Sequence, residues 1–332
     1  MSPINKSDVN NSIKNIIIIQ IGKIGDMVLT IPLFYYLKQI YPNARLTVLS
    51  SISNNEIPRN LSYVDETIIY SKNILTGFLL LKSLRRRQFD LLIDLNYNYS
   101  RTSERILKTL NPKQSFGFNF EEKLYDIDLS SISKSSHLAD LALAAVNYLN
   151  PDLDFNADAP LVNEFKIKEN IPEFKNDGKI RILFNISAGS KSRAWSEENW
   201  SSLIKDSINK FGSDKYNYFI TGLYADKVKI INIRNNINSN CLTYIKQYKL
   251  TTLFNIISST NLLISPDTSL IHIASAYNIP VLGLYPDVDW NLEKFKPLSE
   301  LNEVIVSNSS ENIFDIKEKA VFEKYCSLIE RI

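Results

Sequence analysis

Short apolar runs that alternate with helical segments constrain the fold of this chain most. The first run, at residues 16–21, is almost entirely isoleucine and is typical of a strand buried on both faces of a parallel sheet. A helical stretch follows up to about Tyr41, with Pro32 in the first turn, where proline is tolerated. Further strands are predicted at 46–49, 67–70 and 90–95, and further helices at 75–87, 103–110 and 137–149.

Residues 150–179 break this alternation. They hold three prolines, several acidic residues and little periodicity, which is typical of a boundary between domains. The length of 332 residues also suits two domains of about 150 residues each. We therefore place an N-terminal lobe at 1–155, a linker at 156–174 and a C-terminal lobe at 175–332.

The second half of the chain repeats the alternation. Strands are predicted at 180–186, 216–221, 262–265 and 281–285, and helices at 196–211, 225–235, 250–258, 269–277 and 313–332. The pattern predicts an α/β protein with two doubly wound, Rossmann-like lobes. Ligands bind such lobes beyond the carboxyl ends of the strands, so we expect the lobes to face a central cleft. The last helix is a candidate to pack back on the N-terminal lobe.

Composition excludes several classes of protein. A net charge of +2 gives no sign of the basic surface that nucleic-acid-binding proteins carry. Two separated cysteines disfavour a disulfide scaffold and favour a reducing compartment. The polar first residues lack the apolar core of a signal peptide, and no segment approaches the ~20 apolar residues that cross a bilayer. We expect a cytoplasmic protein. A pI near 8.2 permits weak attraction to an anionic membrane, so peripheral contact with the inner face of the inner membrane stays open.

The segment GKIGD at 22–26 follows the first predicted strand. It lacks the GxGxxG pattern, which disfavours a dinucleotide site and an oxidoreductase. Gly25 lets the backbone approach a ligand closely, and Asp26 then lies at the carboxyl end of a strand. A carboxylate there can act on a substrate or simply cap the helix, and both interpretations stay open.

Two further loops bring polar groups to the second lobe. In SAGSKSRAW, Lys191 and Arg193 could neutralise a departing diphosphate or be solvated surface cations. In SPDTSLIH, Asp267 is a good helix cap, and the backbone N–H groups at 268–270 form a ready anion site. Plain capping is the alternative for that loop. His272 follows on the first turn, where a structural histidine is the commoner case.

The composition also disfavours metal and triad chemistry. Two histidines and two cysteines are too few for a transition-metal cluster. Asp-x-Asp occurs three times, and none of these pairs directly follows a clear buried strand. The chain has no Gly-x-Ser-x-Gly elbow, so a hydrolase triad has no support.

Together the three loops resemble glycosyltransferase family 9, the ADP-heptose:lipopolysaccharide heptosyltransferases. The opening IIIIQIGKIGDMVLTIPLFYYLKQIYPNARLTVL is similar to the family's strand, Gly-Asp step, proline and Tyr-Pro. The stretch ILFNISAGSKSRAWSEENW resembles its loop with a basic residue two before a tryptophan. SPDTSLIHIASAYNIPVLGLYP resembles its Asp-Thr-Gly…His-x-Ala…Pro-Val segment. The resemblance implies a GT-B fold, an inverting mechanism and no metal or other cofactor.

The resemblance also implies roles for single residues in donor binding. Arg193 occupies the place where the family usually has lysine, so a point-charge contact with phosphate becomes a bidentate one. Asp226 takes the place of a glutamate that reaches the donor nucleoside. The segment around Asp267 and His272 resembles the cradle for the donor diphosphate, with Ser269 in place of the usual glycine. The implied donor set is Lys191, Arg193, Asp226, Asp267, Thr268, Ser269, Leu270 and His272.

In the first lobe, Asp26 resembles the catalytic base of the family. His137 resembles a histidine of the acceptor lobe, and Gly25 and Arg101 complete the implied acceptor site. The implied partners are a nucleotide-sugar donor, most simply ADP-heptose, and an anionic glycolipid or oligosaccharide acceptor. A non-catalytic nucleotide-sugar-binding protein, or a family member with another donor and acceptor, stays as an alternative.

Overall fold

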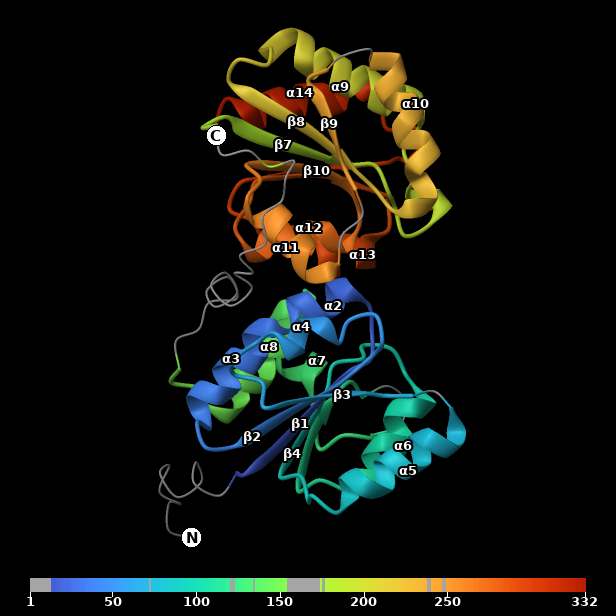
Figure 1. Cartoon of the computed structure of the whole chain (residues 1–332). Helices are drawn as coiled ribbons and strands as arrows, with labels where there is room; N and C mark the ends of the chain where they lie inside the picture. The colour runs from blue at the N-terminus through green and yellow to red at the C-terminus, as the bar shows by residue number, and fades with distance from the viewer. Residues whose placement is uncertain are drawn as a thin grey trace. The chain divides into compact units, whose positions relative to one another are not determined.

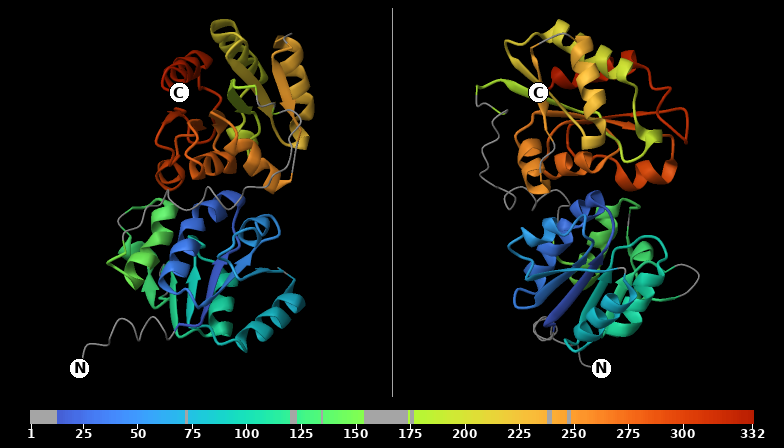
Figure 2. Two further views of the ribbon diagram at one scale, coloured as in Figure 1. Left: turned by 60° about the vertical axis from the view of Figure 1, so that its left-hand side comes forward. Right: turned by 45° about the vertical axis from the view of Figure 1, so that its right-hand side comes forward.

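The computed structural model describes residues 13–71, 73–119, 123–133, 135–153, 174, 177–237, 240–246 and 249–332. The chain divides into two compact units, Met1–Glu164 and Phe165–Ile332 (Figure 1). Each unit has three layers, with a parallel sheet between two layers of helices (Figure 2).

The sheet of the first unit has six strands in the order β3-β2-β1-β4-β5-β6, and all neighbours are parallel. The strands are β1 (Asn15–Gln20), β2 (Arg45–Ser50), β3 (Glu66–Ile69), β4 (Leu91–Asp94), β5 (Gln114–Gly117) and β6 (Ile127–Asp128). From β1 the sheet is built outward in one direction through β2 and β3 and then in the other through β4, β5 and β6, so its topological switch point lies between β1 and β4. In open α/β sheets, ligands bind at the carboxyl edge beside this switch point.

Helices cover both faces of this sheet, which explains why β1 is apolar throughout. One face carries α2 (Ile24–Leu29), α3 (Ile31–Ile40), α4 (Glu56–Arg59), α7 (Leu129–Ile132) and α8 (Leu138–Leu149) (Figure 1). The other face carries α5 (Ile74–Arg85) and α6 (Arg101–Leu110). Side chains alternate along a strand, so Ile17 and Ile19 pack toward α5 and α6 while their neighbours face the other layer.

The second unit repeats the same winding, in the order β12-β11-β10-β7-β8-β9. Its strands are β7 (Ile180–Asn185), β8 (Tyr216–Thr221), β9 (Leu242–Ile245), β10 (Leu262–Pro266), β11 (Val281–Tyr285) and β12 (Asn302–Val306). One face carries α9 (Glu197–Phe211), α10 (Lys227–Ile237) and α14 (Glu318–Ile329); the other carries α11 (Leu250–Ser258), α12 (Ser269–Ala276) and α13 (Asp289–Phe295). The predicted α/β class, doubly wound in both halves, is confirmed.

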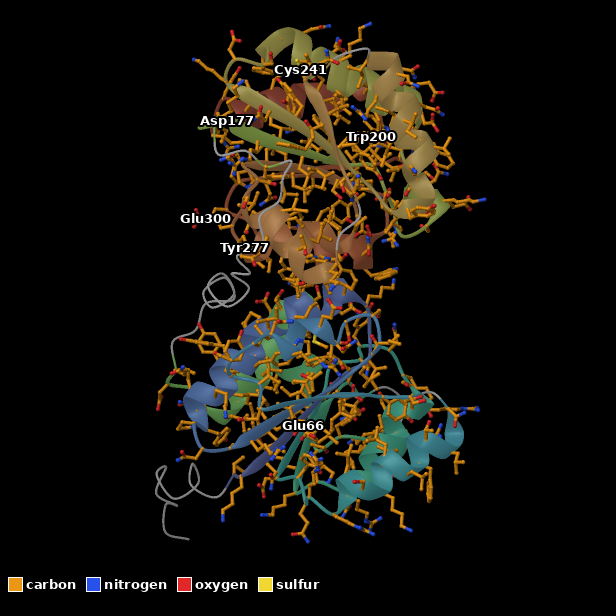
Figure 3. The ribbon with its side chains drawn as sticks, in the orientation of Figure 1. Glu66, Asp177, Trp200, Cys241, Tyr277 and Glu300 are labelled. Atoms are coloured by element: carbon orange, nitrogen blue, oxygen red, sulfur yellow. The ribbon has the colours of Figure 1, made fainter. Side chains whose placement is uncertain are left out.

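The core of the second unit is built on aromatic side chains. Trp195 and Trp200 meet edge to face with ring centroids 5.0 Å apart, and both are buried. Figure 3 labels Trp200. The Trp195 indole N–H donates to the carbonyl of Ile316 at 3.0 Å. Helix α14 packs against α9 and contributes Tyr325 and Leu328 to the same core.

The largest differences from the predicted helix boundaries concern the first and the last helix. The helix expected to run to Tyr41 is two helices, because α2 ends at Leu29 and α3 begins at Ile31 with Pro32 in its first turn. Proline has no N–H to continue α2, so the break comes before it. The last helix begins at Glu318 instead of 313, since the preceding residues form turns that bury Ile313.

Candidate active site

The first candidate site lies at the switch point of the first unit. Asp26 is the third residue of α2, directly after the carboxyl end of β1. Its side chain is nearly buried, and its Oδ2 accepts the Lys23 backbone N–H at 3.1 Å. Asp26 therefore does cap its helix, although from within the first turn and not from the residue before it.

Gly22 makes room for this carboxylate. A Cβ at Gly22 would lie 2.5 Å from Asp26 Oδ2 and 2.8 Å from Gln20 Oε1. The side chains of Asp26 and Gln20 therefore both lie against the Cα of Gly22, and any side chain at position 22 would collide with them. Gly25, for which a close approach to a ligand was predicted, lies buried inside α2, and its contact with a ligand stays a prediction; Gly22 adds a second close approach that was not predicted.

Gln20, the last residue of β1, was also missed. It is 1% exposed, and its Oε1 accepts the Gly22 N–H at 3.2 Å, which fixes the orientation of the amide. Its Nε2 has no hydrogen-bond partner within the described part of the chain. A buried, unsatisfied N–H is costly unless a ligand or water accepts from it, so it marks a donor at this edge of the sheet.

Asn54 and Ser51 hold the loop after β1 in place from the end of β2. The buried Asn54 Nδ2 donates to the carbonyls of Gln20 at 3.1 Å and Gly22 at 3.2 Å, while its Oδ1 accepts the Ser51 N–H at 2.9 Å. The Ser51 hydroxyl donates to the Gly22 carbonyl at 3.2 Å. The loop that leads to Asp26 is thus held by residues that follow a neighbouring strand, which no local sequence pattern reveals.

The electrostatics of Asp26 favour a group that can accept a proton. Burial raises its pKa above the ordinary value for aspartate, and this effect outweighs the opposing Lys23 N–H and the Lys23 charge. A higher pKa makes the carboxylate a stronger base near neutral pH. A second carboxylate, Asp94, ends the adjacent β4; it is buried, and burial raises its pKa too.

Hydrogen bonds within the unit engage both oxygens of Asp94. Its Oδ2 accepts the Tyr125 hydroxyl at 2.7 Å, and its Oδ1 accepts from the Asn96 N–H at 2.9 Å and the Asn96 side-chain amide at 2.7 Å. Asp94 therefore shapes the loop that leads to α6 and is not free to act on a substrate.

The other residues predicted for the acceptor site lie in different environments. Arg101 is exposed at the start of α6, which begins at the carboxyl edge of the sheet because it follows β4. His137 is 1% exposed and caps α8, where its Nδ1 accepts the Ala139 N–H at 3.3 Å. The position of His137 is that of a structural cap, while Arg101 is open to a ligand.

The second candidate site lies at the switch point of the second unit, between β7 and β10. Arg193 stands in a short 3₁₀ turn, Lys191–Arg193, and its Nη1 donates to the Asp267 carboxylate at 2.7 Å and to the Asp267 carbonyl at 3.1 Å. Asn291 Nδ2 donates to the same carboxylate at 3.0 Å. The structure therefore brings Arg193 and Asp267 together as predicted, but as an ion pair.

The ion pair changes the role of Asp267. Thr268, and not Asp267, is the N-cap residue of α12, and the nearly buried Asp267 carboxylate instead orients Arg193. Gly189 lies beneath the guanidinium, because a Cβ there would come within 2.9 Å of Arg193 Nη2. Nη1 is thus held in place, whereas Lys191 is exposed at the start of the same turn.

The start of α12 is held by a buried amide. Asn185 Nδ2, at the end of β7, donates to the hydroxyls of Ser265 at 2.9 Å and Thr268 at 3.3 Å. The first N–H groups of α12, at Ser269 and Leu270, precede the helical hydrogen-bond ladder and lie at its positive end. Asn185 fixes where these donors lie, so it is a positioning residue, and no sequence pattern predicted it.

Asp226 and His272 are the other two residues of the predicted donor set whose surroundings the structure describes. Asp226 lies in a 3₁₀ turn after β8 and accepts a hydrogen bond from the Ser187 hydroxyl, which in turn accepts the Leu223 N–H at 2.6 Å. Asp226 is therefore tied to the loop after β7 that leads to Arg193. The His272 ring is buried on α12 with its centroid 5.9 Å from that of Phe295, as expected for a structural histidine.

Neither a metal cluster nor a membrane span emerges from the described residues. Within these ranges, no three His, Cys, Asp or Glu side chains are grouped so that they could hold a metal ion. No helix among the same residues has both the length and the apolar character needed to cross a membrane.

Comparisons with known proteins identify the family and the fold of this chain. Residues 78–326 match the family described as glycosyltransferase family 9 (heptosyltransferase), a range that includes the loops of the second unit. An Escherichia coli K12 protein named "Putative lipopolysaccharide heptosyltransferase 4" is 24% identical over 299 residues, which cover 85% of this chain and 79% of that protein.

Solved structures show the same fold. A glycosyltransferase family 9 crystal structure from Veillonella parvula has a TM-score of 0.77 at 17% identity and covers 96% of this chain and 98% of its own. The E. coli heptosyltransferase WaaC with ADP-2-deoxy-2-fluoro heptose has a TM-score of 0.73 at 15% identity, with 96% and 99% covered. These likenesses confirm the predicted GT-B type of fold. The chain belongs to glycosyltransferase family 9, the heptosyltransferase family.

Proposed function

We propose that this enzyme moves a heptose from ADP-heptose to a hydroxyl of an anionic lipopolysaccharide or lipooligosaccharide core, with inversion at the anomeric carbon. Family membership supports the glycosyl transfer, and the names of the E. coli relatives support the heptose donor and the acceptor class. We further propose that the reaction takes place in the cytoplasm, at the inner face of the inner membrane, because the proposed substrates are a nucleotide sugar and a lipid-linked acceptor.

The observation that carries the proposal is the setting of Asp26. The carboxylate is held at the carboxyl edge of the first sheet by its own helix and by the close backbone at Gly22. As the acceptor oxygen attacks the anomeric carbon, Asp26 takes the hydroxyl proton, and the bond from that carbon to the diphosphate oxygen breaks. The raised pKa of Asp26 suits this task, because proton transfer to a stronger base is more favourable.

Gln20 extends the acceptor site beside the base. Its Nε2 is fixed in direction and lacks a partner among the described residues, so we propose that it donates to an acceptor oxygen next to the attacking hydroxyl. The exposed Arg101, at the same edge of the sheet, supplies charge for an anionic acceptor.

The second unit holds the donor and receives the charge that develops on the leaving ADP. Arg193, held by Asp267, and the N–H groups at the start of α12 supply cationic and dipolar stabilisation. Asp226 and the exposed Lys191 complete the proposed donor set. Because these groups neutralise the diphosphate themselves, we propose that the reaction needs no metal ion.

Asp26→Asn tests the assignment of the base. Asparagine accepts the same capping hydrogen bond but cannot take a proton, so turnover should fall by about 10²–10⁴-fold while ADP still binds. The control is Asp140→Asn, the same change at the same position of the first turn of α8, which should leave turnover intact. Thermal melting should shift by a few degrees at most in both variants.

The pH dependence of turnover gives a second readout of the same group. Asp26 is active when ionised, so the wild-type rate should fall as pH drops through a pKa above the usual value near 3.9. Asp26→Asn should lose this acidic limb. Near wild-type turnover in Asp26→Asn would assign Asp26 to capping alone, and loss of ADP binding would assign it to the donor site.

A further inference from the structure

The outward side of α5 carries large apolar side chains in solvent. Leu75, Phe78 and Leu79 are 66%, 58% and 56% exposed. With 3.6 residues per turn, these positions lie on one side of the helix, and Lys82 and Arg86 continue that side. We call these five residues the α5 outer face.

The side of a helix that faces solvent is normally polar, whereas the α5 outer face begins with apolar residues. The opposite side of α5 is properly buried, since Leu81 and Leu84 are each 1% exposed and belong to the core beneath α5 and α6. The outer face should then be polar, but its first half is apolar. Three large apolar side chains together on one exposed helix face mark an interaction surface.

The charges around the face point to an anionic partner. Lys82 and Arg86 are exposed, and α5 itself contains no acidic residue. Helix α6 lies beside α5 (Figure 1). It carries the exposed Arg101 and Arg105.

The acidic residues described near this face are already paired with cations. Glu66 forms an ion pair with Arg87 at the end of the α5 segment. Glu104 on α6 accepts from Lys108 at 2.6 Å and from the Tyr99 hydroxyl at 2.8 Å. The unpaired charge that surrounds the apolar stripe is therefore positive.

We propose that the α5 outer face docks on the surface of an anionic lipid bilayer. The helix would lie in the plane of the interface, with Leu75, Phe78 and Leu79 among the lipid headgroups and acyl ends. Lys82 and Arg86 keep their charged ends at the phosphates while their stems cover apolar surface. This docking goes beyond the proposed glycosyl transfer and requires neither Asp26 nor the donor loops.

Vesicle sedimentation tests the proposal with the full chain. The probes are vesicles of phosphatidylcholine alone and vesicles that also contain about one third phosphatidylglycerol, without any glycolipid acceptor. The protein should sediment with the anionic vesicles and much less with the neutral ones. Salt at about 1 M should release most of it, because the screening length falls to about 3 Å.

Substitutions on the α5 outer face separate the contribution of its cations to vesicle binding from that of its apolar side chains. Lys82→Ala with Arg86→Ala should lower the partition coefficient by roughly 25-fold, from about fivefold for each cation near an anionic surface. Leu75→Ser with Phe78→Ser and Leu79→Ser should lower it by at least about tenfold. The matched controls, Phe314→Ser at 62% exposure and the exposed pair Lys205→Ala with Lys319→Ala in the second unit, should bind as wild type.

Three results would overturn the proposal. The first is the absence of sedimentation with anionic vesicles, and the second is sedimentation that the outer-face variants do not change. The third is concentration-dependent self-association, seen by size-exclusion chromatography, that only the outer-face variants remove; it would make the face an interface between protein copies. Turnover of the Leu75, Phe78 and Leu79 variant on a soluble acceptor should match wild type, so its vesicle defect is distinguishable from a failed active site.

Discussion

Gly22→Ala perturbs the proposed base without removing it. The new Cβ would lie 2.5 Å from Asp26 Oδ2, whereas a relaxed contact needs about 3.5 Å. The carboxylate must therefore move by roughly 1 Å, since Gln20 Oε1, 2.8 Å from the same point, crowds the other side. A displacement of this size at a reacting group costs about 10²-fold in rate.

The substitution should also destabilise the first unit. Moving the carboxylate breaks its 3.1 Å hydrogen bond from the Lys23 N–H, a loss of about 1 kcal/mol in the free energy of unfolding. The assay combines turnover, ADP binding by calorimetry and thermal melting. We expect turnover to fall about 10²-fold with ADP affinity unchanged, because the donor groups lie in the second unit.

Gly212→Ala is the matched control. Gly212 has φ +70°, and a Cβ there would meet nothing within 4 Å, so alanine costs backbone strain of about 1–3 kcal/mol without touching either site. It should melt earlier than wild type and keep its turnover. If Gly22→Ala instead kept its turnover to within about a factor of three, the close contact would not position a catalytic group, and the reasoning would be refuted.

The remaining predictions concern substrate contacts and metals. Arg193→Ala should weaken ADP binding by about 1.5–3 kcal/mol in calorimetry. It should also destabilise the second unit, since Asp267 loses its cation; adding Asp267→Asn should restore melting but not ADP affinity, and unchanged affinity in both variants would remove Arg193 from the donor site. Turnover should survive excess EDTA, whereas loss restored by Mn²⁺ would contradict the metal-free assignment. Gln20→Leu should raise KM for the acceptor with kcat and ADP affinity nearly unchanged, and an unaltered KM would exclude the proposed contact of Nε2.

Regular strands buried by helices on both faces were the part of the fold that the sequence predicted well. The run at 16–21 was recognisable because a parallel strand covered on both sides needs apolar residues at every position. Four shorter strands were missed. Thus β5 has Phe116 as its one large apolar residue, and β12 has three apolar residues after Asn302 and Glu303 and is only half buried, so neither has the long apolar run of a strand covered on both faces.

The candidate site was predictable only where the chemistry lies in a local motif. Asp26, Arg193 and Asp267 stand in loops that follow strands, and the sequence singled them out. The residues that position them come from other strands: Asn54 reaches the loop after β1 from the end of β2, and Asn185 reaches the start of α12 from the end of β7. Such partners are distant in sequence and carry no pattern of their own.

The identical strand order of the two units has an evolutionary consequence. Among the described residues, the hydrogen bonds that hold each candidate site at the switch point of its sheet come from its own unit. Under the proposed function, mutations in the loops of the first unit can therefore change the acceptor without disturbing the groups around Arg193. Conversely, the second unit can change its nucleotide sugar while the setting of Asp26 is inherited intact. On this proposal, a lineage can change the two specificities of the enzyme one at a time.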